Sequence, residues 1–311
     1  MSAAAQPRGQ ADGEPWTVLR MMLWSADYLK TKGVDSARLD AEYLLAHVLG
    51  LGRLEMYLQH ERPLTSRELD EFRPLLKRRA KREPLQYVLG RQSFRTLELE
   101  VGPGVLIPRP ETEQLVEAVL SWTKEPAQGG RTDMVGLDIG TGSGAIALSL
   151  LAEGPFARVV ATDVSPVALD VAARNRAALG STAKLDLRPG TLFEPLAPEE
   201  RFDVVVSNPP YVSEGDRGGL APEIVDWEPS EALFGGSDGL SVIRSIVAGA
   251  PAHLRPGGLL ALEIGLGQAR AVAALAEISE DYRDVKIRRD LAGKERIVTA
   301  TSSASNIERG A

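Results

Sequence analysis

Residues 207–212 (SNPPYV) place a carboxamide, two prolines and an aromatic ring directly after an apolar stretch. Neither Pro209 nor Pro210 can donate a backbone hydrogen bond, so the pair does not suit a central strand. One interpretation is a plain strand end followed by a turn, since Pro and Asn are common in loops. The other is a rigid corner that holds the Asn208 side chain and the Tyr211 ring in fixed directions. The choice between them depends on what else lies nearby in the fold.

A rigid corner of this kind would suit the methylation of a planar amide or amino nitrogen. The lone pair of such a nitrogen is delocalised, which makes it a poor nucleophile. Two acceptors that take both of its N–H bonds fix its plane and return electron density to the nitrogen. The Asn208 side-chain oxygen and the Pro209 carbonyl oxygen can form this pair, and the Tyr211 ring can stack on the flat group. No general base is evident, so positioning for in-line attack would supply most of the rate.

A second motif, residues 137–148 (LDIGTGSGAIAL), lies between a predicted strand and a predicted helix. It contains one acid and three glycines: Asp138, Gly140, Gly142 and Gly144. Glycines in such a loop let the backbone approach a ligand closely and leave helix N–H groups facing it. Asp163 stands about twenty residues further on, where a ribose-binding acid is expected. The loop and the acid predict a nucleoside-containing cofactor, but they do not distinguish NAD from S-adenosylmethionine.

Apolar segments alternate with helix-like segments from about residue 110 onward. The predicted strands cover 134–139, 158–163, 184–189, 202–207, 258–264 and 296–301. A helix is predicted to begin at Ser165 and Pro166, as N-cap and first residue, and to end at Gly180. This alternation is typical of a doubly wound α/β fold, in which helices cover both faces of a mostly parallel sheet.

The two chemical motifs follow the first and the fourth predicted strands. In a doubly wound sheet, ligands bind beyond the carboxyl ends of the strands where the strand order reverses, and these two strands are usually neighbours there. The Asn-Pro-Pro-Tyr corner is therefore predicted to face the cofactor. A nicotinamide enzyme has no need of that corner, so we predict S-adenosylmethionine as the cofactor.

Residues 16–89 show helical spacing of apolar side chains and predict a small helical bundle. Helices are predicted to end at Gly33 and Gly50. Asp35 is predicted to cap one helix, Thr65 and Glu68 to form the capping box of another, and Pro74 to kink or restart that helix. Residues 92–107 alternate apolar and polar residues and predict a β-hairpin that connects two domains. The expected division is a disordered N-terminus at 1–14, a helical substrate-binding domain at 15–90, a β-hairpin linker at 91–108, a methyltransferase domain at 109–301 and a disordered tail at 302–311.

A basic stretch, residues 75–84 (LLKRRAKREP), ends the helical region. The simpler interpretation is a solvated helix face, and the alternative is a contact surface for RNA or an RNA-bound partner. The whole chain has 43 acidic and 36 basic side chains and a formal charge of -7. That balance argues weakly against a protein whose whole surface wraps nucleic acid, and it does not exclude a local basic patch.

Composition also narrows the class of protein. The chain has no cysteine, which excludes disulfides and thiolate metal sites. Its only histidines, His47, His60 and His253, are too scattered to suggest a metal cluster. Residues 1–15 lack the apolar stretch of a secretory signal, and no run of apolar residues is long enough for a membrane span. A cytoplasmic protein that binds no metal is therefore expected.

These motifs together resemble those of the release factor glutamine N5-methyltransferases of the HemK/PrmC type. The resemblance covers about residues 15–300. It rests on EPLQYVLG (83–90), VLIPRPETEQLVE (105–117), LDIGTGSGAIAL (137–148), FDVVVSNPPYV (202–212), EPSEALFGGSDGL (228–240) and LEIG (262–265). Asn-Pro-Pro-Tyr alone is only moderately specific, because amino-directed DNA and RNA methyltransferases share it. The IPRPETE and SNPPYV segments with a helical N-terminal domain are much more specific.

The resemblance implies a seven-stranded, Rossmann-like methyltransferase sheet with S-adenosyl-L-methionine as donor and S-adenosyl-L-homocysteine as product. The implied acceptor is the glutamine of the Gly-Gly-Gln motif of class I peptide chain release factors. By position, the donor site contains Asp138, Gly140, Thr141, Gly142, Ser143, Gly144, Asp163, Leu192 and Asn208, with Asp163 at the ribose and Leu192 beside the adenine. Asn208, Pro209, Pro210 and Tyr211 would bind the glutamine, and the N-terminal helices would help to hold the release factor. A monomer that binds neither membrane nor nucleic acid directly is expected.

Several positions leave alternatives open. Thr191 stands where relatives often carry an acid, which puts a polar contact to the adenine in doubt, and Thr96 stands in the hairpin where a glycine is frequent. Arg109 and Glu111 either begin a helix or line the mouth of the active site. Glu263, at the end of a predicted strand, is interpreted as structural.

Two other functions compete with release factor methylation. The first is methylation of an adenine or guanine amino group in nucleic acid, which would use the same Asn-Pro-Pro-Tyr chemistry and the basic stretch. The net acidity and the lack of an evident target-recognition domain argue against it. The second is a non-catalytic module that binds adenosylmethionine, and the intact Asn-Pro-Pro-Tyr argues against that.

Overall fold

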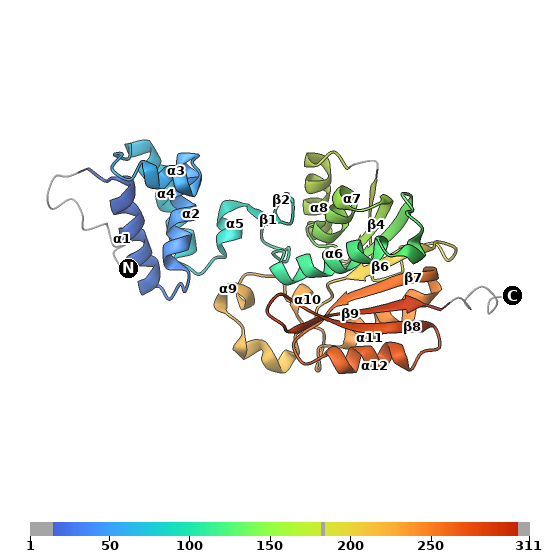
Figure 1. The fold of residues 1–311 in the computed structure, drawn as a ribbon. Helices are drawn as coiled ribbons and strands as arrows, with labels where there is room; N and C mark the ends of the chain where they lie inside the picture. The colour runs from blue at the N-terminus through green and yellow to red at the C-terminus, as the bar shows by residue number, and fades with distance from the viewer. Residues whose placement is uncertain (1–14, 182–183, 304–311) are drawn as a thin grey trace. The chain divides into compact units, whose positions relative to one another are not determined.

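The computed structural model describes residues 15–181 and 184–303, in two compact units that cover Met1–Leu89 and Gly90–Ala311 (Figure 1). The termini predicted to be disordered, 1–14 and 304–311, lie outside the described residues. Ser302 and Ser303, which the predicted tail included, are described, and Ser302 is the last residue of a strand. Each unit has its own buried core.

The first unit is helical, as predicted. Its helices are α1 (Val18–Thr31), α2 (Ala37–Leu49), α3 (Arg53–Leu58), α4 (Ser66–Arg79) and α5 (Leu85–Leu89). Gly50 ends α2 in the left-handed conformation, and Thr65 and Glu68 form the predicted capping box of α4. The predicted cap at Asp35 is wrong, because Ser36 occupies the N-cap position and its hydroxyl donates to Asp40. Helix α4 continues through Pro74 without ending there.

Two arginines of the basic stretch form their polar contacts inside this unit. Arg79 is buried and donates to the Asp40 carboxylate at 2.6 Å. Arg78 donates to the Glu83 carboxylate at 2.9 Å and to the Val88 carbonyl oxygen at 3.2 Å. The prediction of a solvated helix face is therefore wrong for the buried Arg79, whereas Arg78 stays half-exposed and also bonds within the unit.

The hairpin belongs to the second unit. Its strands β1 (Arg91–Phe94) and β2 (Leu97–Glu100) pair antiparallel, and residues 101–107 continue as a loop. Phe94 and Leu99 are fully buried in the same core as helix α6 (Pro110–Thr123). The hairpin is thus packed into the unit and is not a free linker. Its left-handed turn residue is Arg95, with φ 51°, so Thr96 needs no glycine-like conformation.

The second unit contains the predicted doubly wound sheet, with strand order β5-β4-β3-β6-β7-β9-β8. The strands are β3 (Met134–Ile139), β4 (Phe156–Asp163), β5 (Leu185–Pro189), β6 (Phe202–Ser207), β7 (Leu254–Glu263), β8 (Tyr282–Arg289) and β9 (Glu295–Ser302). All neighbours pair parallel except β9, which is antiparallel to both β7 and β8. Strand β8 was not identified from the sequence because it is a mostly solvent-facing edge strand rich in charged residues.

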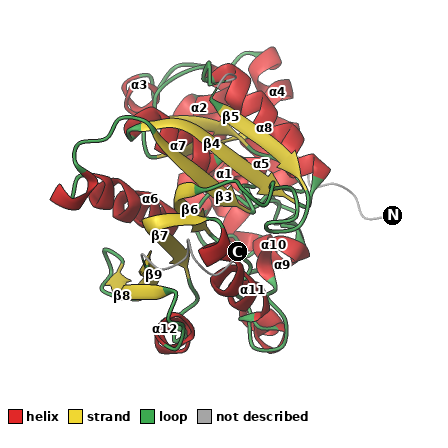
Figure 2. Ribbon diagram, turned by 90° about the vertical axis from the view of Figure 1, so that its right-hand side faces the viewer, coloured by secondary structure: helices red, strands yellow, loops and turns green. Residues whose placement is uncertain are grey.

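Helices cover both faces of this sheet (Figure 2). Helices α6 and α7 (Ala145–Glu153) share one apolar core with the sheet, and α11 (Ser241–Gly249) and α12 (Ala269–Glu277) share the other. Helix α8 (Pro166–Ala178) packs on β4 and β5 and begins at the predicted cap, Ser165. The remaining short elements are η1 (Pro126–Gln128), η2 (Glu214–Gly219), α9 (Pro222–Val225), α10 (Ser230–Leu233) and η3 (Ala250–Ala252).

Strands β3 and β6 lie side by side at the point where the strand order reverses. Ile139 pairs with Ser207 at their carboxyl ends, and the Ser207 hydroxyl donates to the Ile139 carbonyl oxygen at 2.7 Å. The glycine loop and the Asn-Pro-Pro-Tyr corner therefore leave the sheet from adjacent positions. The prediction that these two strands are neighbours is confirmed.

Candidate active site

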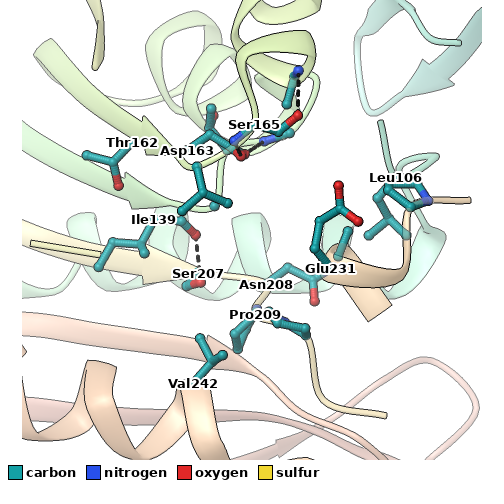
Figure 3. Close-up of a pocket in the computed structure, with 18 of the residues that line it drawn as sticks. Leu106, Ile139, Thr162, Asp163, Ser165, Ser207, Asn208, Pro209, Glu231 and Val242 are labelled. Atoms are coloured by element: carbon teal, nitrogen blue, oxygen red, sulfur yellow. Dashed lines mark hydrogen bonds between the residues drawn. The ribbon is translucent and has the colours of Figure 1, made fainter. Parts of the chain in front are cut away.

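A cavity of about 390 Å³ opens at the carboxyl ends of β3, β4 and β6 (Figure 3). Among the predicted site residues, those that line it are Gly140, Thr141, Gly142, Ser143, Asp163, Leu192, Asn208, Pro209 and Pro210. Asp138, Gly144 and Tyr211 do not line it. The fold thus brings the glycine loop, the ribose-type acid and the proline corner to one cavity.

The glycine loop folds around the buried Asp138. Gly140, Gly142 and Gly144 all have positive φ values of 70°, 57° and 83°, which only glycine adopts without strain. The Asp138 carboxylate accepts from the Thr141 hydroxyl at 2.7 Å and from the Ala147 backbone N–H at 3.2 Å. Burial raises the pKa of Asp138 to about 7. Asp138 therefore holds the loop in shape from below instead of facing a ligand.

Asp163 holds the same loop from the cavity side. One carboxylate oxygen accepts from the Gly142 backbone N–H at 2.8 Å, and the other accepts from the Ser165 backbone N–H at 2.9 Å. Burial raises the pKa of Asp163, while these N–H groups oppose the change. Each oxygen keeps further acceptor capacity, so the carboxylate can receive two hydroxyl groups of a ribose.

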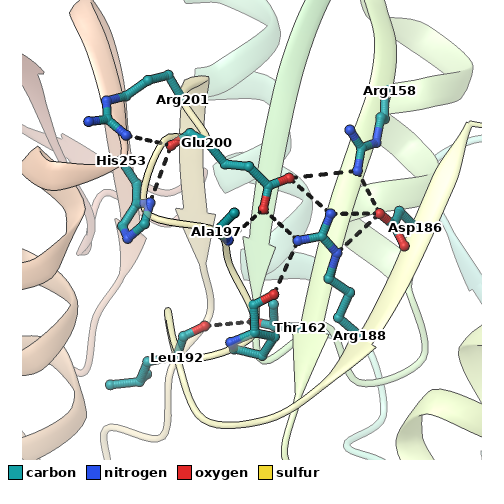
Figure 4. A network of polar contacts seen from close by, with 10 residues as sticks. Arg158, Thr162, Asp186, Arg188, Leu192, Ala197, Glu200, Arg201 and His253 are labelled. Carbon is teal, nitrogen blue, oxygen red and sulfur yellow. Dashed lines mark hydrogen bonds and ion pairs between the residues drawn. The ribbon is translucent and has the colours of Figure 1, made fainter.

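The adenine side of the predicted cofactor site is a loop after β5 that carries Thr191 and Leu192, both of which line the cavity. Leu192 has φ 52°, and its carbonyl oxygen accepts from the Thr162 hydroxyl at 3.2 Å. Behind the loop, Arg188 donates to Asp186 at 2.9 Å, to Glu200 at 2.6 Å and to a loop carbonyl oxygen at 3.2 Å (Figure 4). This ionic network holds the loop at Pro195, and sequence analysis did not find it.

The Asn-Pro-Pro-Tyr corner is anchored on one side by helix α6. The Asn208 Nδ2 donates to the Thr112 hydroxyl oxygen at 3.0 Å. The carboxamide oxygen has no partner among the described residues and is not among their buried unpartnered atoms. Asn208 therefore offers an open acceptor to a group in the cavity.

Tyr211 anchors the other side of the corner. Its hydroxyl donates to Glu263 at 3.2 Å, and its ring packs beside the apolar core that contains α11 and α12. Burial raises the pKa of Tyr211 far above its usual range, so the hydroxyl stays protonated. Gly239 approaches so closely that a Cβ there would lie 2.1 Å from the Tyr211 carbonyl oxygen. The ring faces packed protein in this structure, not the cavity.

Two segments far apart in sequence, 104–108 and 229–232, contribute to the cavity wall. The buried Glu228 accepts from the Arg109 guanidinium and, at 3.2 Å, from the Ile107 backbone N–H. Neither Arg109 nor Glu111 lines the cavity, whereas Pro108 and Thr112 do. Sequence analysis missed Thr112 and Glu228, although both lie in segments that carry the family resemblance.

The Arg109–Glu228 pair gives a testable prediction on stability. Arg109→Ala leaves the Glu228 carboxylate buried without its cation, which is expected to cost about 3 kcal/mol of unfolding free energy. Arg91→Ala is the control, because Arg91 forms a 3.2 Å pair with Glu98 in which both side chains are exposed. That change is expected to cost less than about 1 kcal/mol. Equal losses in urea denaturation would contradict the prediction.

No helix among the described residues is long and apolar enough to cross a membrane. Nor does any group of three or more His, Cys, Asp or Glu side chains within the described ranges have the geometry to hold a metal ion.

Comparison with known proteins gives matches over both units. A family model described as the PrmC N-terminal domain matches residues 21–90, and one described as the Methyltransferase small domain matches residues 123–227. The catalytic domain of hMettl16, solved in complex with MAT2A 3'UTR hairpin 6, superposes with a TM-score of 0.53 at 18% identity. That match covers 75% of this chain and 83% of the other, and it shows a shared fold alone.

Curated relatives match along most of their length. A release factor glutamine methyltransferase of Geobacter sulfurreducens is 47% identical over 84% of this chain and 89% of its own. One of Cereibacter sphaeroides is 44% identical over 89% of this chain and 95% of its own. The resemblance seen in the motifs is therefore confirmed, and the chain belongs to the release factor glutamine methyltransferase family.

Proposed function

We propose that this chain transfers a methyl group from S-adenosylmethionine to N5 of the glutamine in the Gly-Gly-Gln motif of class I peptide chain release factors. The observation that carries the proposal is the open carboxamide oxygen of Asn208, in a cavity shared with the glycine loop. Membership of the family supports the choice of a glutamine acceptor.

The cavity suits the positively charged donor. Its charged lining residues are both acids, Asp163 and Glu231, and the Glu231 carboxylate reaches toward the cavity from α10 (Figure 3). A negative cavity favours a cation by direct Coulomb attraction. The residues proposed to hold the donor are Gly140–Ser143 at its amino-acid part, Asp163 at its ribose, and Thr191 and Leu192 at its adenine. When bound, the donor supplies an electrophilic methyl group on a sulfonium.

The proline corner would orient the acceptor. Asn208 Oδ1 and the Pro209 carbonyl oxygen would each accept one N–H of the glutamine amide, which fixes its plane and raises the electron density on nitrogen. Pro210 keeps the corner rigid. For Tyr211 we propose an anchoring role in place of stacking, since its hydroxyl is bound to Glu263. Positioning then supplies most of the rate acceleration.

The remaining assignments belong to the same proposal. The helical unit would help to hold the release factor, and the protein would act as a cytoplasmic monomer in support of translation termination. A nucleic-acid acceptor has less support, because Arg78 and Arg79 of the basic stretch form contacts inside the helical unit.

The direct test offers the protein isotope-labelled S-adenosylmethionine with either a release factor or total RNA and DNA. The expected result is one methyl group on the glutamine of the Gly-Gly-Gln peptide, located by mass spectrometry. A release factor with Gly-Gly-Ala in that motif is the control and should remain unlabelled. Label on adenine or guanine, with none on the release factor, would contradict the proposal.

A further inference from the structure

A chain of hydrogen bonds leads from the buried Glu263 to the cavity. Glu263, at the carboxyl end of β7, is 1% exposed, and Thr112, in the first turn of α6, is 4% exposed. The Thr112 hydroxyl donates to Glu263 Oε2 at 2.6 Å and accepts from Asn208 Nδ2 at 3.0 Å. Thr112 therefore connects the Glu263 carboxylate to the carboxamide of Asn208.

The direction of these bonds follows from what each group can donate. An ionised carboxylate only accepts, so the single hydroxyl proton of Thr112 points at Glu263. The Thr112 oxygen can then only accept from Asn208, which must present its NH₂ group. The carboxamide oxygen of Asn208 is left as the atom available to a ligand. Through Thr112, the Glu263 carboxylate thus fixes which end of the Asn208 carboxamide is left free.

The second oxygen of Glu263 is also committed. Oε1 accepts from the Tyr211 hydroxyl at 3.2 Å. One carboxylate therefore holds the first and the last residues of the Asn-Pro-Pro-Tyr corner, from below the cavity.

We propose that Glu263 is a positioning residue of the methyl transfer, which acts through Thr112 and Tyr211 to keep the Asn208 carboxamide oxygen turned toward the substrate amide. The inference rests on the proposed function, in which that oxygen accepts a glutamine N–H. It assigns a role to a residue that touches neither donor nor acceptor.

This arrangement makes the corner sensitive to pH near neutrality. Burial raises the pKa of Glu263 to about 7, hydrogen bonds from Thr112 and Tyr211 oppose that change, and nearby Glu111 and Arg296 act in opposite directions. A protonated Glu263 can donate to Thr112, which frees the threonine proton to bind the carboxamide oxygen. Asn208 then presents NH₂ to the substrate, so turnover is expected to fall as the pH drops through about 7.

The test compares Glu263→Gln with two changes at Thr112. The introduced glutamine of Glu263→Gln can donate to Thr112 at every pH. We therefore expect kcat to fall about tenfold or more at pH 8, and we expect the acidic limb of the pH profile, which is the fall of kcat below about pH 7, to disappear. Thr112→Val should show the same loss of kcat, and Thr112→Ser, which keeps the hydroxyl, should retain most of the activity. The Kd for S-adenosylmethionine should stay within about twofold in all three. The Tm of Glu263→Gln should not fall at pH 8, since ionisation of a carboxyl with a raised pKa costs stability above that pKa.

Glu111→Gln is the matched control, on the same helix as Thr112. It removes a charge that raises the pKa of Glu263. The plateau of kcat should therefore remain, and the acidic limb should move to lower pH. Full turnover with an unchanged limb in Glu263→Gln, or wild-type turnover in Thr112→Val, would overturn the proposal.

A further measurement separates this inference from the proposed function. The side-chain NH₂ signal of Asn208 in NMR spectra, assigned by its absence in Asn208→Ala, should shift with an apparent pKa near 7 in the wild type and not in Glu263→Gln. The signal needs no release factor. If it does not titrate, the relay is wrong whatever the acceptor is. If it titrates but no release factor is methylated, the proposed acceptor is wrong and the relay stands.

Discussion

Asn208→Ala is expected to lower kcat by about two to three orders of magnitude. The change removes the open carboxamide oxygen, so one N–H of the substrate amide is left without its acceptor on the protein. It also leaves the Thr112 hydroxyl without its donor. The Kd for S-adenosylmethionine should stay within about twofold, because the glycine loop and Asp163 are untouched. Single-turnover methylation of a release factor and calorimetric binding of the donor measure the two quantities.

Ser213→Ala is the control for this experiment. Ser213 lies just beyond the corner, and its hydroxyl donates to Asp216 at 2.7 Å in a solvent-exposed turn. Turnover of that variant should equal wild type. Near-normal turnover of Asn208→Ala would show that the proline corner does not bind the acceptor. A large loss of donor affinity would show that Asn208 acts mainly in the donor site, a place that the family resemblance also implies for it.

The second large effect is expected at Asp163. Asp163→Ala removes the acceptor for the ribose hydroxyls and the two bonds that hold Gly142 and Ser165 in place. The loss of the two hydrogen bonds between the ribose hydroxyls and the carboxylate is expected to reduce the binding free energy by about 3 kcal/mol. Donor binding then weakens by about two orders of magnitude. The Kd for S-adenosyl-L-homocysteine should rise by a similar factor, because the ribose is common to both. Calorimetric titration of both compounds checks this.

Asp170→Ala provides a matched control, since Asp170 is an exposed carboxylate on α8 that does not line the cavity. Its donor Kd should equal wild type. If Asp163→Ala bound the donor as tightly as the wild type, the assignment of the ribose to this carboxylate would have to be abandoned.

Local sequence patterns were sufficient to identify most of the fold. The spacing of apolar segments identified six of the seven strands, and the Thr65–Glu68 capping box and the stop at Gly50 were read correctly. These features depend on residues a few positions apart, where backbone preference and short-range hydrogen bonds dominate. Strand β8 was not predicted, because an edge strand with solvated charges lacks the run of apolar residues that marks a buried strand.

The meeting of the glycine loop, Asp163 and Asn208–Pro210 at one cavity was also predicted correctly from the sequence. The directions of the Tyr211 and Asp138 side chains were not predicted from the sequence. Both are side chains whose direction depends on what packs around them: Tyr211 turns to a carboxylate on β7, and Asp138 turns into the loop that it supports. A motif specifies residue types, whereas packing specifies which way each side chain points.

The contacts that orient the site join residues that no local pattern connects. Thr112 lies 96 residues from Asn208 and 151 from Glu263, and the Arg109–Glu228 pair spans 119. The parallel sheet brings these residues together because the carboxyl ends of β6 and β7 meet at one edge, against the start of α6. The same burial that closes this edge raises the pKa of Glu263 to about 7. The residue types that line the cavity can thus be predicted from the sequence, while their orientation and ionisation follow from long-range packing.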